Sequence, residues 1–281
     1  MKIAERPALR DSLAAHGLLA NKRFGQHFLL DLNITRKIAR LAGPLEGRVV
    51  IEVGPGPGGL TQALLEAGAQ VIAIEKDSRF LPLLNDLAAQ AQGRLDVIGA
   101  DALEADEARL LAELAPGRPA CVVANLPYNV SVPLLIKWLK QITLYERLTL
   151  MFQKEVAGRI VAAPGGSDYG RLSVIAQAIA TCELVMSLPA RAFTPPPKVE
   201  SAVVRLTPRP DAPGHGLAAA LERVTQAAFG QRRKMLRSSL KSLGGEALCR
   251  SAGIDANLRA EAVGVPGFLA LARLVEQALD K

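Results

Sequence analysis

The sequence predicts an α/β fold with a parallel sheet in residues 1–210 and a small all-helical domain in residues 211–281. Short apolar runs that are typical of buried parallel strands alternate with helical patterns. The first of these runs passes directly into a glycine-rich turn, as in nucleotide-binding βαβ units. A stretch rich in proline and glycine, residues 207–216, then separates the strands from a tail with helical periodicity only.

The composition indicates a globular protein with ample core. The chain has 281 residues, of which 49% are hydrophobic and 22% charged. Charged residues interrupt its first twenty positions, and no segment reaches about 18 uninterrupted apolar residues, so neither a signal peptide nor a membrane span is expected. Cys121, Cys182 and Cys249 lack the spacing of metal ligands. We therefore expect free thiols in a reducing, cytoplasmic environment and no metal site.

The net charge of +7 is concentrated at the two ends of the chain. Residues 1–40 carry a net charge of +5 and residues 211–281 of +3, whereas residues 41–210 carry −1. Two basic segments that flank a neutral core are suited to a polyanion such as a nucleic acid. The alternative is an ordinary solvated surface, which the charge distribution alone does not exclude.

Three segments are expected before the first strand: an arm, a loop and a short helix. Residues 1–20 are expected to form a flexible or loosely helical arm, and residues 21–31, basic and aromatic, a lid or binding loop. Asn33 is the predicted N-cap of a short helix that ends at Gly43. Within the loop, His27 is either a structural histidine or part of a binding site.

The first βαβ unit contains a candidate nucleotide site. A strand at residues 49–53 leads into Gly54, followed by a helix at residues 60–67 and a second strand at residues 70–74 that ends on Glu75. Glycines in such a turn let the backbone approach a ligand, and an acid at the end of the next strand can accept both ribose hydroxyls. This pattern alone suits a nicotinamide enzyme equally well.

The next two strands sharpen the prediction. The third strand, residues 95–98, is followed by Asp101, which can accept a hydrogen bond from the exocyclic amine of an adenine. The fourth strand, residues 121–125, ends at Asn125. Carboxyl ends of parallel strands meet at one edge of a sheet, where such folds bind ligands. We therefore expect Gly54, Glu75, Asp101 and Asn125 to lie around one crevice.

The segment Asn125-Leu-Pro-Tyr128 is the candidate catalytic motif. Asn125 and the carbonyl of Leu126 can accept the two N–H groups of an amine-bearing base, and the ring of Tyr128 can stack on its face. The alternative is an ordinary strand-to-helix turn, since Asn and X-Pro both favour turns.

Further along, a helix is expected at residues 133–141 and strands at 147–152, 183–188 and 201–206. Three consecutive prolines after Thr194 stiffen the loop that carries Phe193. We expect Phe193 to stack on a base opposite Tyr128; the alternative role is a core anchor.

The tail contains a candidate RNA-binding surface. A helix is predicted at residues 232–243, with leucines on one face and basic residues on the neighbouring face. Either this basic face is merely solvated, or it contacts phosphates. The residues selected for phosphate contact are Arg232, Arg233, Lys234 and Arg237.

With these residues in view, the chain closely resembles the KsgA-type family of small-subunit ribosomal RNA adenine dimethyltransferases. The similarity spans nearly the whole chain, and the proline loop together with the Asn-Leu-Pro-Tyr turn is its most specific part. The matching motifs are Lys22–Leu29, Glu52–Gly56, Asn125–Tyr128, Gln153–Glu155, Tyr169–Ser173, Phe193–Val199, Ser201–Arg205, Phe229 and Gln231–Lys234.

The resemblance implies a Rossmann-like methyltransferase sheet, S-adenosylmethionine as cofactor, and transfer of methyl groups to two adjacent adenines near the 3′ end of small-subunit (16S) RNA. The partner implied is a precursor of the small (30S) subunit, and no long apolar heptad argues against a monomer. The residues that it implies for the cofactor pocket are His27, Leu29, Gly54, Glu75, Asp101 and Asn125. At the position of His27 many members have Asn.

Rival readings belong to other classes. A nicotinamide oxidoreductase would share the glycine turn but has no use for the motif at residues 125–128. A DNA adenine methyltransferase uses a similar strand-end motif. A non-catalytic ribosome-assembly factor would retain the pocket without the reaction.

The related antibiotic-resistance methylases of large-subunit RNA generally lack the triple-proline loop in this form, so its presence favours the small subunit.

Overall fold

The computed structural model describes residues 9–15, 17–18, 26–231 and 233–279, and it divides into two compact units. The first comprises Met1–Ala157 and Leu184–Leu206, and the second comprises Gly158–Glu183 and Thr207–Lys281. This division differs from a single boundary at residue 210. Residues 158–183 group with the tail because Tyr169, Val174 and Ala178 are buried in the hydrophobic cluster of the tail.

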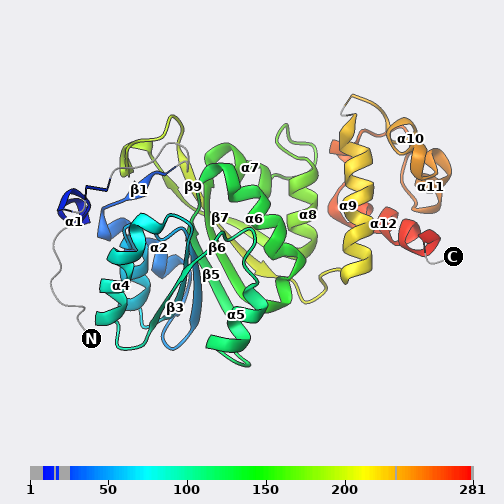
Figure 1. Cartoon of the computed structure of the whole chain (residues 1–281). Coiled ribbons are helices and arrows are strands. Elements are labelled where there is room, and N and C mark those ends of the chain that lie inside the picture. The colour runs from blue at the N-terminus through cyan, green and yellow to red at the C-terminus, as the bar shows by residue number, and fades with distance from the viewer. Residues whose placement is uncertain (1–8, 16, 19–25, 232, 280–281) are drawn as a thin grey trace. The chain divides into compact units, whose positions relative to one another are not determined.

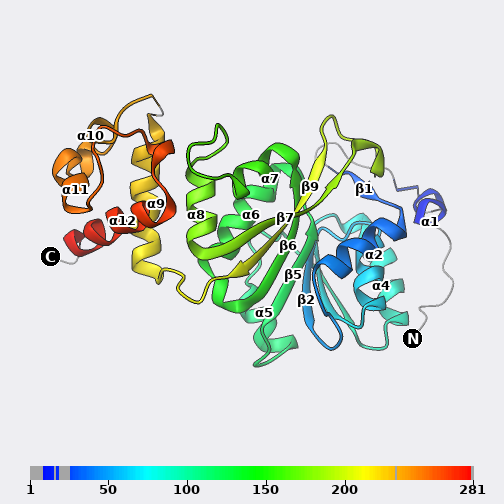
Figure 2. The same ribbon diagram turned by 180° about the vertical axis from the view of Figure 1, so that it is seen from behind.

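A seven-stranded sheet organises the chain, and the predicted α/β class is confirmed. The strands in spatial order are β4 (Leu95–Gly99), β3 (Gln70–Glu75), β2 (Val49–Val53), β5 (Ala120–Asn125), β6 (Tyr145–Gln153), β9 (Ser201–Pro208) and β7 (Ala180–Leu188). The first five pair in parallel, and β9 pairs antiparallel with β6. Figures 1 and 2 show the two sides of this sheet.

Strand β2 forms the centre of the core. Its five residues, Val49–Val53, are all buried, as a strand covered on both faces requires. Alternate residues on one face, such as Val50 with Val71 and Cys121 of the neighbouring strands, pack with three helices in one hydrophobic cluster. These helices are α2 (Leu32–Leu41), α3 (Gly59–Glu66) and α4 (Leu81–Gln90).

Three further helices follow in the chain: α5 (Glu107–Leu114), α6 (Tyr128–Lys140) and α7 (Lys154–Val161). Helix α6 begins five residues before the predicted start at Pro133, which lies inside the helix. Helix α2 is capped by Asp31, whose side chain accepts the N–H of Asn33, so the predicted cap at Asn33 was wrong by two residues. A carboxylate at this position satisfies a free N–H of the first turn.

Two short strands tie the N-terminal loop to the proline loop. In the first unit, β1 (Phe28–Leu29) pairs antiparallel with β8 (Phe193–Thr194), with Leu29 opposite Phe193. Of the predicted arm, only part is described, and it contains α1 (Leu9–Ala15). Residues 21–25 of the predicted binding loop lie outside the described residues.

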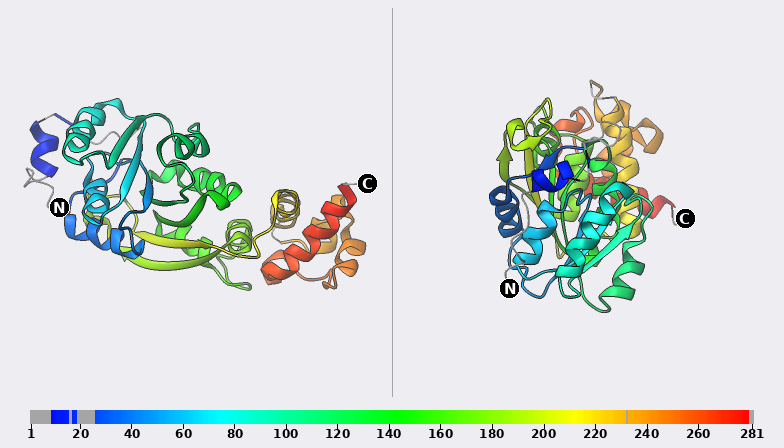
Figure 3. Two further views of the ribbon diagram at one scale, coloured as in Figure 1. Left: turned by 90° about the horizontal axis from the view of Figure 1, so that it is seen from below. Right: turned by 60° about the vertical axis from the view of Figure 1, so that its left-hand side comes forward.

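The second unit consists mainly of helices in its described part. Its helices are α8 (Arg171–Ile179), α9 (His215–Gly230), α10 (Leu236–Ser239), α11 (Gly245–Ser251) and α12 (Val265–Leu279). Helices α9 and α12, yellow and red in Figure 3, pack against each other. The rings of Phe229 and Phe268 stack at 5.4 Å, and the hydroxyl of Tyr169 donates to the carbonyl of Val263.

The helix predicted at residues 232–243 was wrong. Gly230 is the last residue of α9, and Met235 has an extended backbone that bridges to Arg259. Among the described residues of this span, only the four of α10 and a 3₁₀ turn at Lys241–Leu243 are helical. Other 3₁₀ turns lie at Ser78–Phe80, Ile142–Leu144, Ala190–Ala192 and Ala260–Ala262. None of the described helices is long and apolar enough to cross a membrane.

One acidic side chain lies inside the central strand. Glu52 is 1% exposed, and its Oε2 has no hydrogen-bond partner among the described residues. Burial raises the pKa of Glu52 to about 8; Thr61 opposes this shift and the nearby carboxylate of Glu75 adds to it. Between its ordinary value of 4.5 and about 8, the folded chain therefore holds a proton that the unfolded chain releases.

This linkage predicts that the free energy of unfolding falls as pH rises through that window. Each bound proton changes the stability by about 1.4 kcal/mol per pH unit. Urea unfolding of the cofactor-free protein at several pH values from 5.5 to 8.5 measures the slope, with Glu52→Gln as the matched variant. The variant should show a smaller decrease than the wild type; parallel curves would contradict a neutral Glu52.

Candidate functional site

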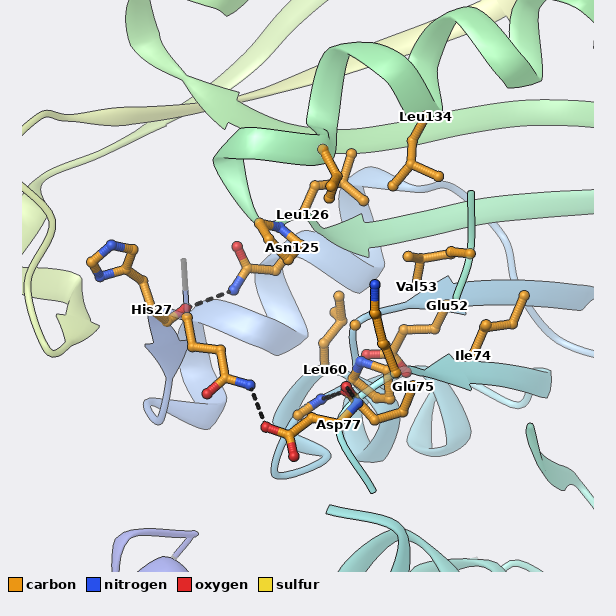
Figure 4. Close-up of a pocket in the computed structure, with 18 of the residues that line it drawn as sticks. His27, Glu52, Val53, Leu60, Ile74, Glu75, Asp77, Asn125, Leu126 and Leu134 are labelled. Atoms are coloured by element: carbon orange, nitrogen blue, oxygen red, sulfur yellow. Dashed lines mark hydrogen bonds between the residues drawn. The ribbon is translucent and has the colours of Figure 1, made fainter. Parts of the chain in front are cut away.

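The predicted crevice exists as a pocket at the carboxyl ends of β2, β3, β4 and β5 (Figure 4). Most of the predicted site residues line it: His27, Leu29, Gly54, Glu75, Asp101, Asn125, Leu126 and Tyr128. The geometric expectation of one shared crevice is thereby confirmed.

The turn after β2 contains glycines whose backbone conformation disfavours other residues. Gly54 and Gly56 have φ angles of +68° and +52°, which side-chain-bearing residues rarely adopt. A Cβ atom on Gly56 would also lie 3.1 Å from the ring of Phe28. Glycine is therefore required here by the backbone conformation and, at Gly56, by the packing of Phe28.

Glu75 is fixed at the end of β3 by two backbone donors. Its Oε2 accepts the N–H of Gly56 at 2.9 Å, and its Oε1 accepts the N–H of Asp77 at 2.8 Å. Burial raises the pKa of Glu75, and these backbone N–H groups oppose that shift. Each carboxylate oxygen retains a second lone pair, so a held Glu75 can still accept hydroxyl donors from a ligand.

Asp101 lies at the more solvated rim of the pocket. Its Oδ1 accepts the N–H of Leu103 at 2.9 Å, and its Oδ2 lies 2.6 Å from the ammonium of Lys76. The hydrogen bond from Lys76 lowers the pKa of Asp101. An ionised carboxylate is an acceptor only, which suits an exocyclic amine.

Asn125 has a defined amide orientation. Its Nδ2 donates to the backbone carbonyl of His27 at 3.1 Å, the contact drawn as a dashed line in Figure 4. Because the donor side is engaged, Oδ1 is the atom that remains to accept a hydrogen bond from a ligand. This orientation is compatible with an acceptor role for Asn125, which stays a prediction.

The ring of Tyr128 is also held at both ends. Its hydroxyl forms a hydrogen bond of 2.7 Å with Ser201, and its ring lies 5.6 Å from the imidazole of His27 at an angle of 30°. The Nδ1 of His27 lies 2.8 Å from the carbonyl of Pro195. The side chain of His27 therefore faces Tyr128 and the proline loop, while its backbone carbonyl orients Asn125.

The expected position of Phe193 opposite Tyr128 does not agree with the structure. Phe193 is 3% exposed, belongs to the core cluster on one face of the sheet, and is absent from the described pocket lining. Pairing of β8 with β1 turns this ring into the core. The aromatic neighbour that Tyr128 does have is His27.

Of the predicted RNA-binding residues, Arg233, Lys234 and Arg237 are exposed in the second unit. They precede or occupy α10 rather than one face of a continuous helix. Arg232 lies outside the described residues.

Sequence reasoning missed several residues that line the pocket. Among them are Gln26, Lys76 and Asp77. Gln26 donates to Asp77 at 2.9 Å, which links the N-terminal loop to the segment after β3. The position of Asp77 two residues after the predicted ribose-binding acid was the available signal.

Comparison with known proteins agrees with this geometry. The family model described as ribosomal RNA adenine dimethylase matches residues 17–277. A ribosomal RNA small subunit methyltransferase A from Phenylobacterium zucineum is 65% identical over 97% of this chain and 94% of its own length. The corresponding protein from Caulobacter vibrioides is 63% identical over 91% of this chain and 97% of its own length.

Two solved structures share the fold. A dimethyladenosine transferase from Plasmodium falciparum has a TM-score of 0.73 at 25% identity, covering 87% of this chain and 96% of that one. The 23S rRNA methyltransferase ErmE has a TM-score of 0.65 at 27% identity, covering 89% of this chain and 100% of that one. The Rossmann-like methyltransferase fold predicted from the sequence is thereby confirmed, and the chain belongs to the ribosomal RNA adenine dimethylase family.

Proposed function

We propose that this enzyme transfers methyl groups from S-adenosylmethionine to the N6 amines of two adjacent adenines near the 3′ end of small-subunit ribosomal RNA. The observation that carries the proposal is the fixed acceptor of Asn125, held by His27 next to Tyr128 in the pocket that also contains Glu75. The relatives named for the small subunit support this choice of substrate.

The residues present fit the cofactor. Glu75 can accept hydrogen bonds from the ribose hydroxyls, as in other nucleotide-binding βαβ units, and Asp101 can accept one from the adenine amine. Gly54 and Gly56 line the same pocket, and Glu52 places there a buried carboxyl oxygen without a hydrogen-bond partner among the described residues. When bound, S-adenosylmethionine supplies an activated methyl group on a positively charged sulfur.

Most of the remaining rate enhancement comes from the way this chain positions the adenine amine. An adenine amine is a poor nucleophile because its lone pair is delocalised into the ring. Acceptance of its two N–H groups by Asn125 Oδ1 and the carbonyl of Leu126 favours a pyramidal, nucleophilic nitrogen. Stacking on Tyr128 fixes the plane of the base. In-line alignment contributes up to about 7–11 kcal/mol in such reactions, and the released proton leaves to water.

The second unit is the proposed RNA-binding domain, with Arg233, Lys234 and Arg237 on phosphates of the flanking RNA. Arg232 is proposed for the same role from the sequence alone. Extrusion of a base costs a few kcal/mol, less from a loop, and phosphate contacts offset it. We propose that the enzyme acts as a monomer on a precursor of the 30S subunit in the cytoplasm.

The proposed reaction predicts the product directly. Labelled S-adenosylmethionine is incubated with unmethylated small subunits, and large-subunit RNA and duplex DNA are run alongside. Mass spectrometry of the nucleosides should find N6,N6-dimethyladenine in the small subunit alone. Methylation of large-subunit RNA or DNA instead would contradict the substrate, and cofactor binding with no transfer to any of the three would favour the assembly-factor alternative.

Asn125→Ala should lower kcat by about 10²-fold or more for both methyl transfers, because loss of one preorganised hydrogen-bonding group typically costs that much. Single-turnover rates and the ratio of mono- to dimethylated product measure the effect. Asn129→Ala is the matched control, since Asn129 is an exposed asparagine at the same pocket. Near-normal turnover by Asn125→Ala with cofactor still bound would refute the role.

Arg233→Ala combined with Arg237→Ala should weaken RNA binding and reduce the slope of log K against log salt by roughly two, about one for each phosphate contact. Cofactor affinity should be unchanged. Binding to small-subunit RNA at several salt concentrations measures this, with Arg250→Ala as control because Arg250 is paired with Glu246 in the same unit. An unchanged slope would assign these arginines to the solvated surface.

A further inference from the structure

A buried ion pair joins helix α6 to the loop between β4 and α5. The ammonium of Lys137, in the last turn of α6, lies 2.7 Å from the carbonyl of Ala102 and 2.5 Å from that of Ala105. The same nitrogen donates to Oε1 of Glu107, the first residue of α5, at 2.9 Å and lies 2.7 Å from Oε2 of that carboxylate. All three acceptors come from one segment of six residues.

This arrangement matches the hydrogen-bonding capacity of the groups. An ammonium has three N–H donors, and here it faces three acceptor groups, namely two backbone carbonyls and one carboxylate. Glu107 is 1% exposed and also accepts the indole N–H of Trp138 at 3.1 Å. A carboxylate this deeply buried is stable in its charged form only when it is paired and hydrogen-bonded. Lys137, whose side chain is 20% exposed, supplies that charge.

The two segments joined by Lys137 form two walls of the cofactor and substrate pocket. The loop contributes Asp101, Ala102 and Leu103 to the lining, and α6 begins at Tyr128 and contributes Leu134. Lys137 itself does not line the pocket in the described part of the chain. It is bonded to the carbonyl of Ala102, whose chain neighbour is Asp101.

We propose that Lys137 is a positioning residue that holds the loop carrying Asp101 at the distance from α6 that the adenine of S-adenosylmethionine requires. It acts through the carbonyls of Ala102 and Ala105 and touches no reacting atom. The inference rests on the proposed contact between Asp101 and the adenine amine. Loss of the ammonium leaves both carbonyls to water and frees the loop to move.

The test uses the full-length double variant Lys137→Met with Glu107→Gln, which removes both charges and leaves no unpaired buried carboxylate. Calorimetric titration with S-adenosylhomocysteine and with 5′-methylthioadenosine measures the affinity. The dissociation constant should rise at least tenfold for both ligands by a similar factor, because they share the adenosine. At saturating cofactor, kcat should stay within a few-fold of wild type.

Two further variants separate positioning from simple loss of stability. Leu148→Ala, a fully buried residue of β6 away from the pocket lining, should lower the melting temperature and leave both dissociation constants unchanged. Lys137→Arg keeps the charge, but its planar guanidinium cannot converge on the same three acceptors, so it should weaken binding to an intermediate degree. If the double variant does not fold, the dissociation constants of Lys137→Arg test the inference instead.

A folded Lys137 variant that binds both adenosine ligands within twofold of wild type would overturn the inference. That result is distinct from failure of the proposed function, in which the wild-type protein binds the ligands and yields no dimethyladenine. An effect on S-adenosylhomocysteine with none on 5′-methylthioadenosine would also overturn it, because the altered contact would then concern the amino-acid end of the ligand.

Discussion

The parallel register of β2 with β3 on one side and β5 on the other is the constraint on which the site depends. Val49 lies opposite both Gln70 and Ala120, so the three strands start level and run in the same direction. Their carboxyl ends, together with that of β4, therefore open at one edge of the sheet. Residues that follow these strands, from Gly54 to Asn125, line one pocket as a result. Burial of β2 on both faces fixes this register, because a slip by one residue would exchange the two packed faces.

This part of the fold was predictable because a doubly covered strand reads as an uninterrupted apolar run. Residues 49–53 were predicted with the observed bounds, and the strand-end residues follow from them. The orientation of Asn125 was not predictable, because its partner is a backbone carbonyl 98 residues away. Phe193 shows the same limit. The rigid proline loop indicates that the ring of Phe193 has a fixed position. The pairing of Phe193 with Leu29 decides whether this ring faces the pocket or the core.

The second unit shows how a real periodic pattern can lead to a wrong element. Leu236 and Leu240 are both fully buried, as the helical spacing predicted. The chain nevertheless forms only short helical turns there, because Met235 pairs with Arg259 and because Gly244, at a φ of +112°, ends the last turn. Burial was thus predictable from the pattern, whereas the continuity of the helix depended on distant partners. The basic residues nearby remain exposed, but they are not arranged along one helical face.

With the roles proposed for Asn125 and Leu126, one pocket can both repeat the reaction and end it. Because His27 holds the amide nitrogen, Asn125 presents an acceptor and cannot rotate to donate without losing that bond. An unmodified amine offers two N–H groups to the acceptors at residues 125 and 126, and a monomethylated amine still offers one. A dimethylated amine offers none, so its retention would leave both acceptors unpaired in a partly buried pocket, at a cost of about 1–3 kcal/mol each. The two acceptors proposed to favour the first and second transfers would therefore also favour release of the final product.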